Sequence, residues 1–196
     1  MGIDEREVLR YLEYRGAQAD GAVLAYIKET EADLKTCCRP RCIYEKWPCA
    51  VDPAGTVKIE NIIIESKNLA ARLQGCEWVT LLAATLGSEA DTLLRRYAVT
   101  DAAKAAVAQA VCAAWLEDVC DRLEYQIAEG EAAGGLTVKP RFSPGYGDFH
   151  IRHQKDILCL LERKQRTGIT LTDGFMMAPV KSVTALIGLT NNKIPA

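Results

Sequence analysis

The chain has 196 residues, 49% of them hydrophobic, and its 24 basic and 26 acidic residues give a net charge of −2 at pH 7. Because the two signs of charge are spread along the chain, no basic stripe indicates a nucleic-acid partner. No apolar run approaches the roughly 20 residues of a membrane helix, and "MGIDEREVLR" lacks the apolar core of a secretory signal. We expect a cytoplasmic protein with one domain, residues 1–196, and a substantial core.

The first part of the chain predicts two helices followed by two strands. The segment "IDEREVLRYLEYRG" has Asp4 as an N-cap, Glu7 in the capping-box position and Gly16 as a stop, which is typical of a short helix. A second helix is expected over residues 20–36. The segments "RCIYEKW" and "TVKIENIII" predict strands, and "PCAVDPAG" between them predicts a turn.

The middle of the chain predicts a short helix, a buried strand and two further helices. These segments are, in order, "SKNLAARLQG", "CEWVTLLAATLG", "SEADTLLRRYAV" and residues 100–128. The last is expected to be a long helix, because apolar residues recur at steps of three and four along one face. They are Ala108, Cys112, Trp115, Val119, Leu123 and Ile127. Gly130 is expected to end this helix, and "EGEAAGGLTVKP" to form a flexible connector.

The last part of the chain predicts one helix and one strand. The helix is "QKDILCLLERKQRTG", with cations in its last turn and Gly168 as its stop. Its inward residues are Ile157, Leu158, Leu160 and Leu161. The strand is "APVKSVTALIGL", with Val183, Ala185, Ile187 and Leu189 on one side. The fold class predicted is α+β: a mixed or antiparallel sheet flanked by helices, with one long central helix.

The eight cysteines are expected to be free thiols, because no secretory signal places them in an oxidising compartment. Four of them lie close together in the sequence: Cys37, Cys38, Cys42 and Cys49. Cys38 and Cys42 make C-x-x-x-C, but Glu45 stands where a radical iron–sulfur site needs its third thiolate, and no C-x-x-C pair suggests zinc. A metal site at these thiols is the less favoured alternative.

The usual signatures of dinucleotide binding, nucleotide hydrolysis and zinc proteolysis are missing. The chain has no G-x-G-x-x-G after a strand, no P-loop and no H-E-x-x-H. Asp148, His150 and His153 in "DFHIRH" could form a metal trio, but we favour a polar helix start capped by Asp148. No residue is therefore assigned a catalytic or metal-binding role.

The segment "RFSPGYGDFH", residues 141–150, is unusual in a chain rich in Ala, Leu and Glu. Arg141 offers a fork of donors that matches a carboxylate, and Tyr146 offers an aromatic surface. Gly145 permits a close backbone approach to a ligand. The alternative is a tight turn in which Arg141 pairs with a neighbouring acid such as Asp148 and Tyr146 packs on the core.

Arg141, Gly145 and Tyr146 make the pattern R-x-x-x-G-Y, which resembles the S-adenosylmethionine-binding motif of the activation domain of cobalamin-dependent methionine synthase. The segment "HQKDILCLLERKQRTGITLTDGFMMAPVKSVTALIGL" is similar to the family's helix, T-G-x-x-L-T turn and closing strand. The segments "IDEREVLRYLEYRG" and "CEWVTLLAATLG" are similar to its stand-alone members. The resemblance covers nearly the whole chain.

The resemblance implies an accessory subunit that reactivates a corrinoid-dependent methionine synthase, a methyltransferase of methionine biosynthesis. S-adenosylmethionine would be bound by Arg141, Ser143, Gly145 and Tyr146. Cobalamin would be carried by a partner protein, because the D-x-H-x-x-G pattern of a cobalamin domain is broken by His153. One electron would come from a flavodoxin-like or ferredoxin-like donor. The alternative is a non-catalytic S-adenosylmethionine sensor or interaction scaffold of the same fold.

The sequence departs from the family pattern at three places. The stretch "AAGGLTVKP" has none of the acidic residues that assist the ligand's ammonium group in full-length members, so that contact is missing or comes from elsewhere. His150 stands where proline is expected in G-Y-G-D-x-P, and the chain ends at "LTNNKIPA", before a tyrosine-bearing segment of the multidomain form. The resemblance therefore implies weak ligand binding until a partner closes the site.

Overall fold

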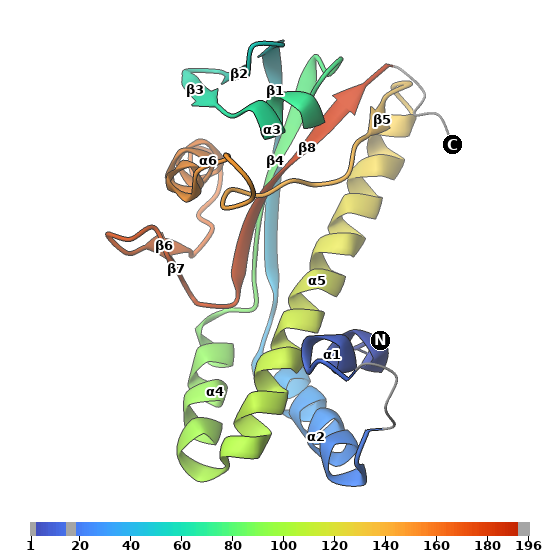
Figure 1. Ribbon diagram of the computed structural model, residues 1–196, viewed down its shortest axis with the longest axis vertical. Coiled ribbons are helices and arrows are strands. Elements are labelled where there is room, and N and C mark those ends of the chain that lie inside the picture. Colours follow the sequence, from blue (N-terminus) through green and yellow to red (C-terminus); the bar gives the residue numbers. More distant parts are fainter. Residues whose placement is uncertain (1–2, 15–18, 192–196) are drawn as a thin grey trace.

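The computed structural model describes residues 3–14 and 19–191 and shows a single α+β domain (Figure 1). Its main sheet has six strands in the order β3-β2-β1-β4-β8-β5, and every neighbouring pair is antiparallel. These strands are β1 (Arg41–Asp52), β2 (Thr56–Ile59), β3 (Ile62–Glu65), β4 (Trp78–Thr85), β5 (Thr137–Val138) and β8 (Ser182–Thr190). A separate antiparallel hairpin pairs β6 (Thr170–Leu171) with β7 (Met177–Ala178).

The helices cover both faces of the sheet. They are α1 (Glu5–Tyr11), α2 (Gly21–Cys37), α3 (Lys67–Arg72), α4 (Ser88–Thr100), α5 (Ala102–Ala132) and α6 (Gln154–Leu161). The long helix α5 runs along one face, α6 lies against the other, and α1, α2 and α4 gather around the first half of α5 (Figure 1). The predicted fold class is confirmed, and the sheet is antiparallel.

The central strands β4 and β8 are buried on both faces. Leu82 and its strand partner Ala185 pack with Leu123 and Ile127 of α5, while the next residues along the strands face α6. Successive side chains of a strand point to opposite faces, so a strand covered on both sides needs apolar residues almost throughout. This requirement explains the nearly continuous apolar run of β4. The predicted inward side of β8 is confirmed as the side that faces α5.

The long helix α5 has the apolar face predicted from its sequence, and all six residues of that face are buried. Asp101 is its N-cap and accepts a hydrogen bond from the Lys104 amide. The predicted end at Gly130 is wrong, because the helix continues to Ala132. The chain turns away at Gly135, which has a φ of 76°. That left-handed conformation is costly for residues with a Cβ atom, so Gly135 is the glycine that permits the turn.

Three boundaries in the sheet differ from the prediction. Strand β1 continues through Pro48 to Asp52, so the turn is confined to the residues before β2. The segment predicted as one strand after that turn is a hairpin of β2 and β3, with Glu60 at a φ of 51°. The connector after α5 is also partly ordered, because Thr137 and Val138 form edge strand β5 on β8.

The first and last helices differ from their predictions in detail. Asp4 caps α1 as predicted, but the Glu7 carboxylate pairs with Arg10 instead of completing a capping box, and Gly16 lies outside the described residues. Helix α6 buries its four predicted inward residues but ends at Leu161, before the cations that were expected in its last turn. Gly168 has a φ of 72°, and a Cβ atom there would lie 2.6 Å from the Arg41 guanidinium.

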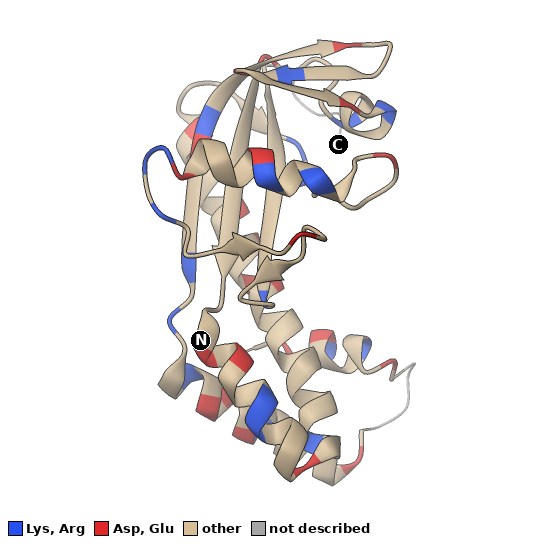
Figure 2. Cartoon of the chain, turned by 90° about the vertical axis from the view of Figure 1, so that its left-hand side faces the viewer, with Lys and Arg blue, Asp and Glu red and all other residues tan. Residues whose placement is uncertain are grey.

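Charges of both signs occur side by side along the helices (Figure 2). Within residues 3–14 and 19–191, no helix combines the length and the apolar character that crossing a membrane requires.

Candidate ligand-binding site

The segment that carries the R-x-x-x-G-Y pattern, residues 141–149, is here named the Arg141 loop. It begins against the sheet, because the Phe142 amide donates to the Leu186 carbonyl and the Phe142 carbonyl accepts from the Leu186 amide, each at 2.9 Å. The loop then folds back, with the Gly145 amide donating to the Phe149 carbonyl at 2.7 Å. Gly145 has a φ of 102°, which favours glycine at this turn. The loop is therefore a defined turn hydrogen-bonded to a central strand.

Helix α3 anchors the other end of the loop. The Asp148 carboxylate accepts hydrogen bonds from the Ser66 hydroxyl at 2.5 Å and from the Lys67 and Asn68 amides at 2.8 and 3.1 Å. The Ser66 hydroxyl bond, together with the two amides, lowers the pKa of Asp148. Gly147 fits closely here, because a Cβ atom would lie 1.9 Å from the side-chain Nδ2 of Asn68. The loop and α3 are thus held together by one carboxylate.

The predicted role of Asp148 as a cap of the following helix is wrong. The turn at Ile151–His153 is capped instead by His150, whose Nδ1 accepts from the Arg152 amide. His153 is buried and its Nδ1 lies 2.7 Å from an Asp156 oxygen. The three residues of the alternative metal trio therefore contact three different partners: Asp148 contacts α3, His150 the Arg152 amide and His153 the Asp156 carboxylate.

Two aromatic rings of the loop form a row with the ring of His153. The centroid of Phe142 lies 6.0 Å from that of Phe149, which in turn lies 5.7 Å from that of His153. Phe149 is fully buried, so this row fixes the loop onto the core. Tyr146 lies 6.2 Å from Phe142 but remains 66% exposed, which contradicts the alternative in which it packs into the core. The phenol ring of Tyr146 is thus a surface that a ligand can contact.

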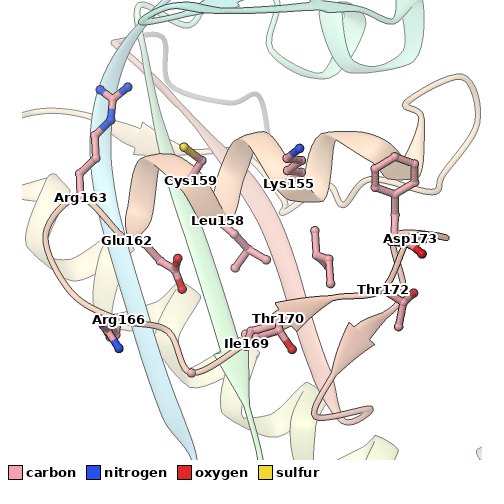
Figure 3. A pocket seen from close by; sticks show the side chains of 13 residues that line it. Lys155, Leu158, Cys159, Glu162, Arg163, Arg166, Ile169, Thr170, Thr172 and Asp173 are labelled. Atoms are coloured by element: carbon pink, nitrogen blue, oxygen red, sulfur yellow. The ribbon is translucent and has the colours of Figure 1, made fainter.

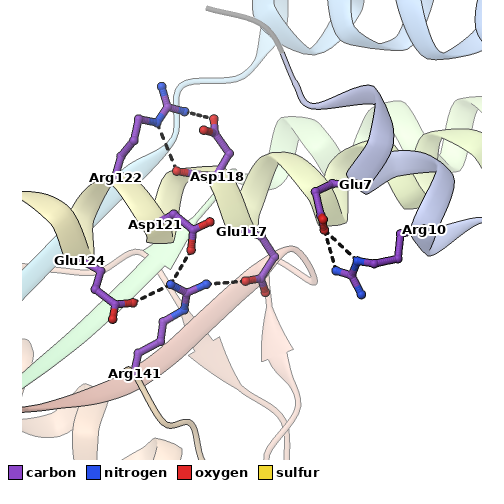
Figure 4. A network of polar contacts seen from close by, with 8 residues as sticks. All are labelled: Glu7, Arg10, Glu117, Asp118, Asp121, Arg122, Glu124 and Arg141. Atoms are coloured by element: carbon purple, nitrogen blue, oxygen red, sulfur yellow. Dashed lines mark hydrogen bonds and ion pairs between the residues drawn. The ribbon is translucent and has the colours of Figure 1, made fainter. Parts of the chain in front are cut away.

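Arg141 points from the loop to α5, where three carboxylates surround its guanidinium (Figure 4). Its Nη2 lies 2.6 Å from Glu117, and its Nη1 lies 2.6 Å from Asp121 and 2.8 Å from Glu124. Burial lowers the pKa of Arg141, but the hydrogen bonds to the three acids outweigh burial and raise it above its usual value. The alternative partner Asp148 is wrong, because the acids that pair with Arg141 come from α5.

The Arg141 cluster, defined as Arg141 with Glu117, Asp121 and Glu124, has more negative than positive charge. Three carboxylates face one guanidinium, which leaves an excess of two negative charges. The neighbouring acids Glu7 and Asp118 already have their own cations, Arg10 and Arg122 (Figure 4). A pocket of about 330 Å³ opens between α1 and α5 and is lined by Asp4, Glu7, Arg10, Ala114, Glu117, Asp118 and Asp121.

Sequence reasoning missed the three acids of the Arg141 cluster. The stretch "AAGGLTVKP" directly before Arg141 has no carboxylate, and the neighbouring acid that follows, Asp148, contacts α3 instead. The steps of four and three between the acids place them on one face of a helix, and that spacing was the available signal. It could not show that this face meets the loop, because the contact joins residues 17 to 24 positions apart.

The other predicted site residues lie within the same loop. Gly145 is exposed at the turn, and Ser143 is half-buried between Phe142 and Pro144 in the chain. Arg141, Gly145 and Tyr146 therefore share one short segment whose backbone is hydrogen-bonded at both ends. In the structure, the candidate site also includes the α5 carboxylates of the Arg141 cluster.

A larger groove, of about 1030 Å³, lies between α6 and the β6–β7 hairpin (Figure 3). Its walls carry Lys155, Glu162 and Arg166, and Leu158 and Ile169 provide apolar surface. None of the residues that line it belongs to the Arg141 loop or to α5. The Arg141 loop remains the better candidate, because it combines a charge pattern, an exposed ring and an anchored turn.

No protein-family model and no curated protein matches this chain. Its α+β fold is similar to a solved structure described as "Crystal Structure of the MetH Reactivation Domain bound to AdoHcy", with a TM-score of 0.71. The sequence identity is 15%, and the alignment covers 100% of this chain and 78% of that chain. At this identity the similarity establishes the fold alone. The fold implied by the sequence resemblance is therefore supported over the full length of the chain.

Proposed function

We propose that this chain binds S-adenosylmethionine and reactivates a corrinoid-dependent methionine synthase, by positioning the methyl donor for cobalamin carried on a partner protein. One observation carries the proposal: Arg141 of the R-x-x-x-G-Y loop meets three carboxylates of α5, and the ring of Tyr146 in the same loop is exposed. The similarity in fold to a MetH reactivation domain bound to AdoHcy, the demethylated analogue of this ligand, supports it.

The chemistry of the loop fits the chemistry of the ligand. S-adenosylmethionine has one carboxylate, one ammonium, one sulfonium and an adenine ring. A guanidinium such as that of Arg141 binds a carboxylate through two parallel hydrogen bonds. Carboxylates on α5 can accept from the ammonium, and the Tyr146 ring can lie beside the sulfonium or the adenine. The negative excess of the Arg141 cluster suits this ligand, whose net charge is positive.

Binding requires the ligand to enter an existing ion-pair network. Of the three acids, Asp121 has the most exposed side chain, at 67%, and Glu124 is the least exposed at 22%. We expect the ligand carboxylate to replace Asp121 at the guanidinium, while the ligand ammonium takes up the carboxylates that are released. Each charged group thus exchanges one oppositely charged partner for another, and no buried charge is left without a partner.

The proposed reaction requires no acid–base catalysis by the chain. Cobalamin on the partner, reduced by one electron from a flavodoxin-like or ferredoxin-like donor, would supply the nucleophile that takes the methyl group. The electron pair of the broken carbon–sulfur bond would stay on sulfur, and S-adenosylhomocysteine would be released. No proton moves, so no general base is needed. The contribution of the Arg141 loop is to hold the methyl group in line with the cobalt.

A reconstitution assay tests the proposal. It combines the chain with a cobalamin-loaded methionine synthase that lacks its own reactivation domain, a one-electron reductant and S-adenosylmethionine, without oxygen. We expect the cob(II)alamin spectrum to change to that of methylcobalamin, and Arg141→Ala to slow the change. Arg163→Ala is the matched control, since Arg163 pairs with Glu60 and Asn61 outside the site.

The outcome of this assay distinguishes a reactivation subunit from a sensor or a scaffold. Equal remethylation without the chain would show that it is not a reactivation subunit. Calorimetry on the isolated chain then separates the alternatives. Binding of S-adenosylmethionine without partner-dependent turnover would identify a sensor, and no binding in either experiment would leave a scaffold.

A further inference from the structure

Two adjacent cysteines lie at the C-terminal end of α2, outside the Arg141 cluster. Cys37 is the last residue of the helix and Cys38 is its C-cap. Their sulfur atoms are 3.6 Å apart. Cys37 is exposed, whereas Cys38 is only 2% exposed and belongs to the same core cluster as Leu34 and Cys112. An accessible sulfur thus lies against a buried second sulfur.

The exposed sulfur can be reached from solvent. Cys37 lines a pocket of about 510 Å³ between α2 and α4, together with Asp33, Thr36, Ser88, Glu89, Thr92, Leu93 and Arg96. This pocket has room for a small reagent, whereas Cys38, which lines a separate pocket of about 380 Å³, is itself only 2% exposed. A reagent therefore meets Cys37 first.

We propose that Cys37 and Cys38 form a modification site that reacts with low-molecular-weight disulfides and closes to a disulfide between the two adjacent residues. In the first step the Cys37 sulfur attacks the reagent disulfide, forms a mixed disulfide and releases one small thiol. In the second step the Cys38 sulfur attacks the Cys37 sulfur and releases the second small thiol. Two protein thiols are oxidised, one reagent disulfide is reduced, and the two protons leave on the small thiols.

The geometry favours the second step. A disulfide bond is about 2.0 Å long, so the two sulfurs, now 3.6 Å apart, need to approach by about 1.6 Å. The reaction is intramolecular, and groups held in contact react much faster than groups that must first meet. The backbone around the pair is held by Arg39, whose guanidinium donates to the carbonyls of Lys35, Thr36 and Cys38.

The product should be reversible. Adjacent Cα atoms are about 3.8 Å apart, which is shorter than the Cα separation of about 4.4 to 6.8 Å in most disulfides. Strained disulfides are reduced more readily than relaxed ones. The site therefore has the character of a labile modification and differs from a structural cross-link.

Peptide mapping can locate the product without ambiguity. Trypsin cleaves after Lys35 and Arg41 but not between Arg39 and Pro40, so one peptide, "TCCRPR", contains these two cysteines and no other. The reduced chain is treated with an excess of a dipyridyl disulfide, whose thiol is a good leaving group. The reaction is stopped with acid, the excess reagent is removed, and the chain is then digested with trypsin near neutral pH. We expect this peptide to lose two hydrogens and to carry no pyridyl group.

Variants provide the decisive comparison. Cys38→Ala should stop the reaction at the mixed disulfide, so its peptide should carry one pyridyl group on Cys37. Cys159, exposed on α6, is the internal control and should carry a pyridyl group in both proteins. A wild-type peptide that stays reduced or keeps the pyridyl group while Cys159 reacts would overturn the proposal. So would a cross-link from Cys38 to Cys112. The wild-type result alone decides if Cys38→Ala does not fold.

Discussion

The two halves of α5 have different surroundings. The first half is packed among α1, α2 and α4, with Val111 and Cys112 fully buried. The second half lies on β4 and β8 through Leu123 and Ile127 and turns its acids toward the Arg141 loop. The difference shows how one helix can serve two purposes. Its first half stabilises the helical part of the domain, and its second half holds charged groups on a rigid support.

Removing a large side chain from the first half of α5 should have the largest effect on stability. Trp115 is 9% exposed within the core cluster around α5. Trp115→Ala removes its packing and leaves a cavity, so we expect the free energy of unfolding to fall by about 3 to 5 kcal/mol. Urea denaturation measures the change.

The matched control for this prediction is Tyr125→Ala in the second half of the same helix. Tyr125 is 64% exposed, and its hydroxyl donates to Glu129 of the same helix. Its removal should change stability by no more than about 0.5 kcal/mol. Equal losses in the two variants would break the distinction between a packed first half and a more open second half.

Removing the cation that faces the second half should mainly affect ligand binding. Arg141→Ala deletes the proposed partner of the ligand carboxylate and leaves three acids facing one another. We expect S-adenosylmethionine to bind more weakly by about 1.5 to 3 kcal/mol, the range for hydrogen bonds to charged groups. Calorimetry measures the dissociation constant, and circular dichroism checks the fold.

Two further variants sharpen this result. Arg141→Lys keeps the charge but loses the planar fork, so it should recover only part of the affinity. Arg163→Ala removes a different ion-paired arginine and should leave binding unchanged. An Arg141→Ala protein that is folded and binds as tightly as the wild type would remove the reason for placing the ligand at this loop.

Local patterns in the sequence predicted most of the helices and strands correctly. The apolar face of α5, the inward residues of α6 and the inward side of β8 follow from side-chain periodicity, which is set by the backbone alone. Endpoints were less predictable. Gly130 looked like a stop, yet helical packing carried α5 past it to Ala132, because one glycine costs a packed helix only about 1 kcal/mol.

The candidate site was predicted only in part. The Arg141 loop stands out because Arg, Gly and Tyr occur together in an irregular segment, and that is a local property. The partners of Arg141 and Asp148 are not local: the first lie on α5, and the second lie at the start of α3, 80 to 82 residues earlier. Such contacts depend on how the sheet brings distant segments together, which periodicity does not specify.

The anchor between the loop and α3 should contribute less to stability than the core of α5. Ser66 is the N-cap of α3, accepting from the Leu69 amide and donating to Asp148. Ser66→Ala should lower the free energy of unfolding by about 1 kcal/mol, as is usual for the loss of a cap. Ser88→Ala is the control, because Ser88 begins α4 but does not cap it. A loss of similar size in both variants would show that the Ser66 contacts add nothing to the anchor.

The smallest effect should be a pH dependence at the same anchor. The Ser66 hydroxyl and the α3 amides hold the pKa of Asp148 below its ordinary value of 3.8. A carboxyl with a lower pKa in the folded chain stabilises the fold fully above its unfolded pKa. That stabilisation is lost as the pH falls through the lower, folded value.

Asp148→Asn removes the titrating group but keeps its size, so the variant should unfold at a lower temperature than the wild type near neutral pH. The gap should narrow only below a pH of about 4, where the wild-type carboxylate takes up its proton and loses its advantage. Thermal unfolding of both proteins across this range measures the gap.

The control is Asp156→Asn, which removes an exposed carboxylate that pairs with His153. This substitution alters an acid near the loop without touching α3. The proposed anchor would be contradicted if the difference in unfolding temperature stayed constant into acid, or if Asp156→Asn reproduced it. The Asp148 carboxylate would then not tie the Arg141 loop to α3, and the loop would be supported by β8 and the second half of α5.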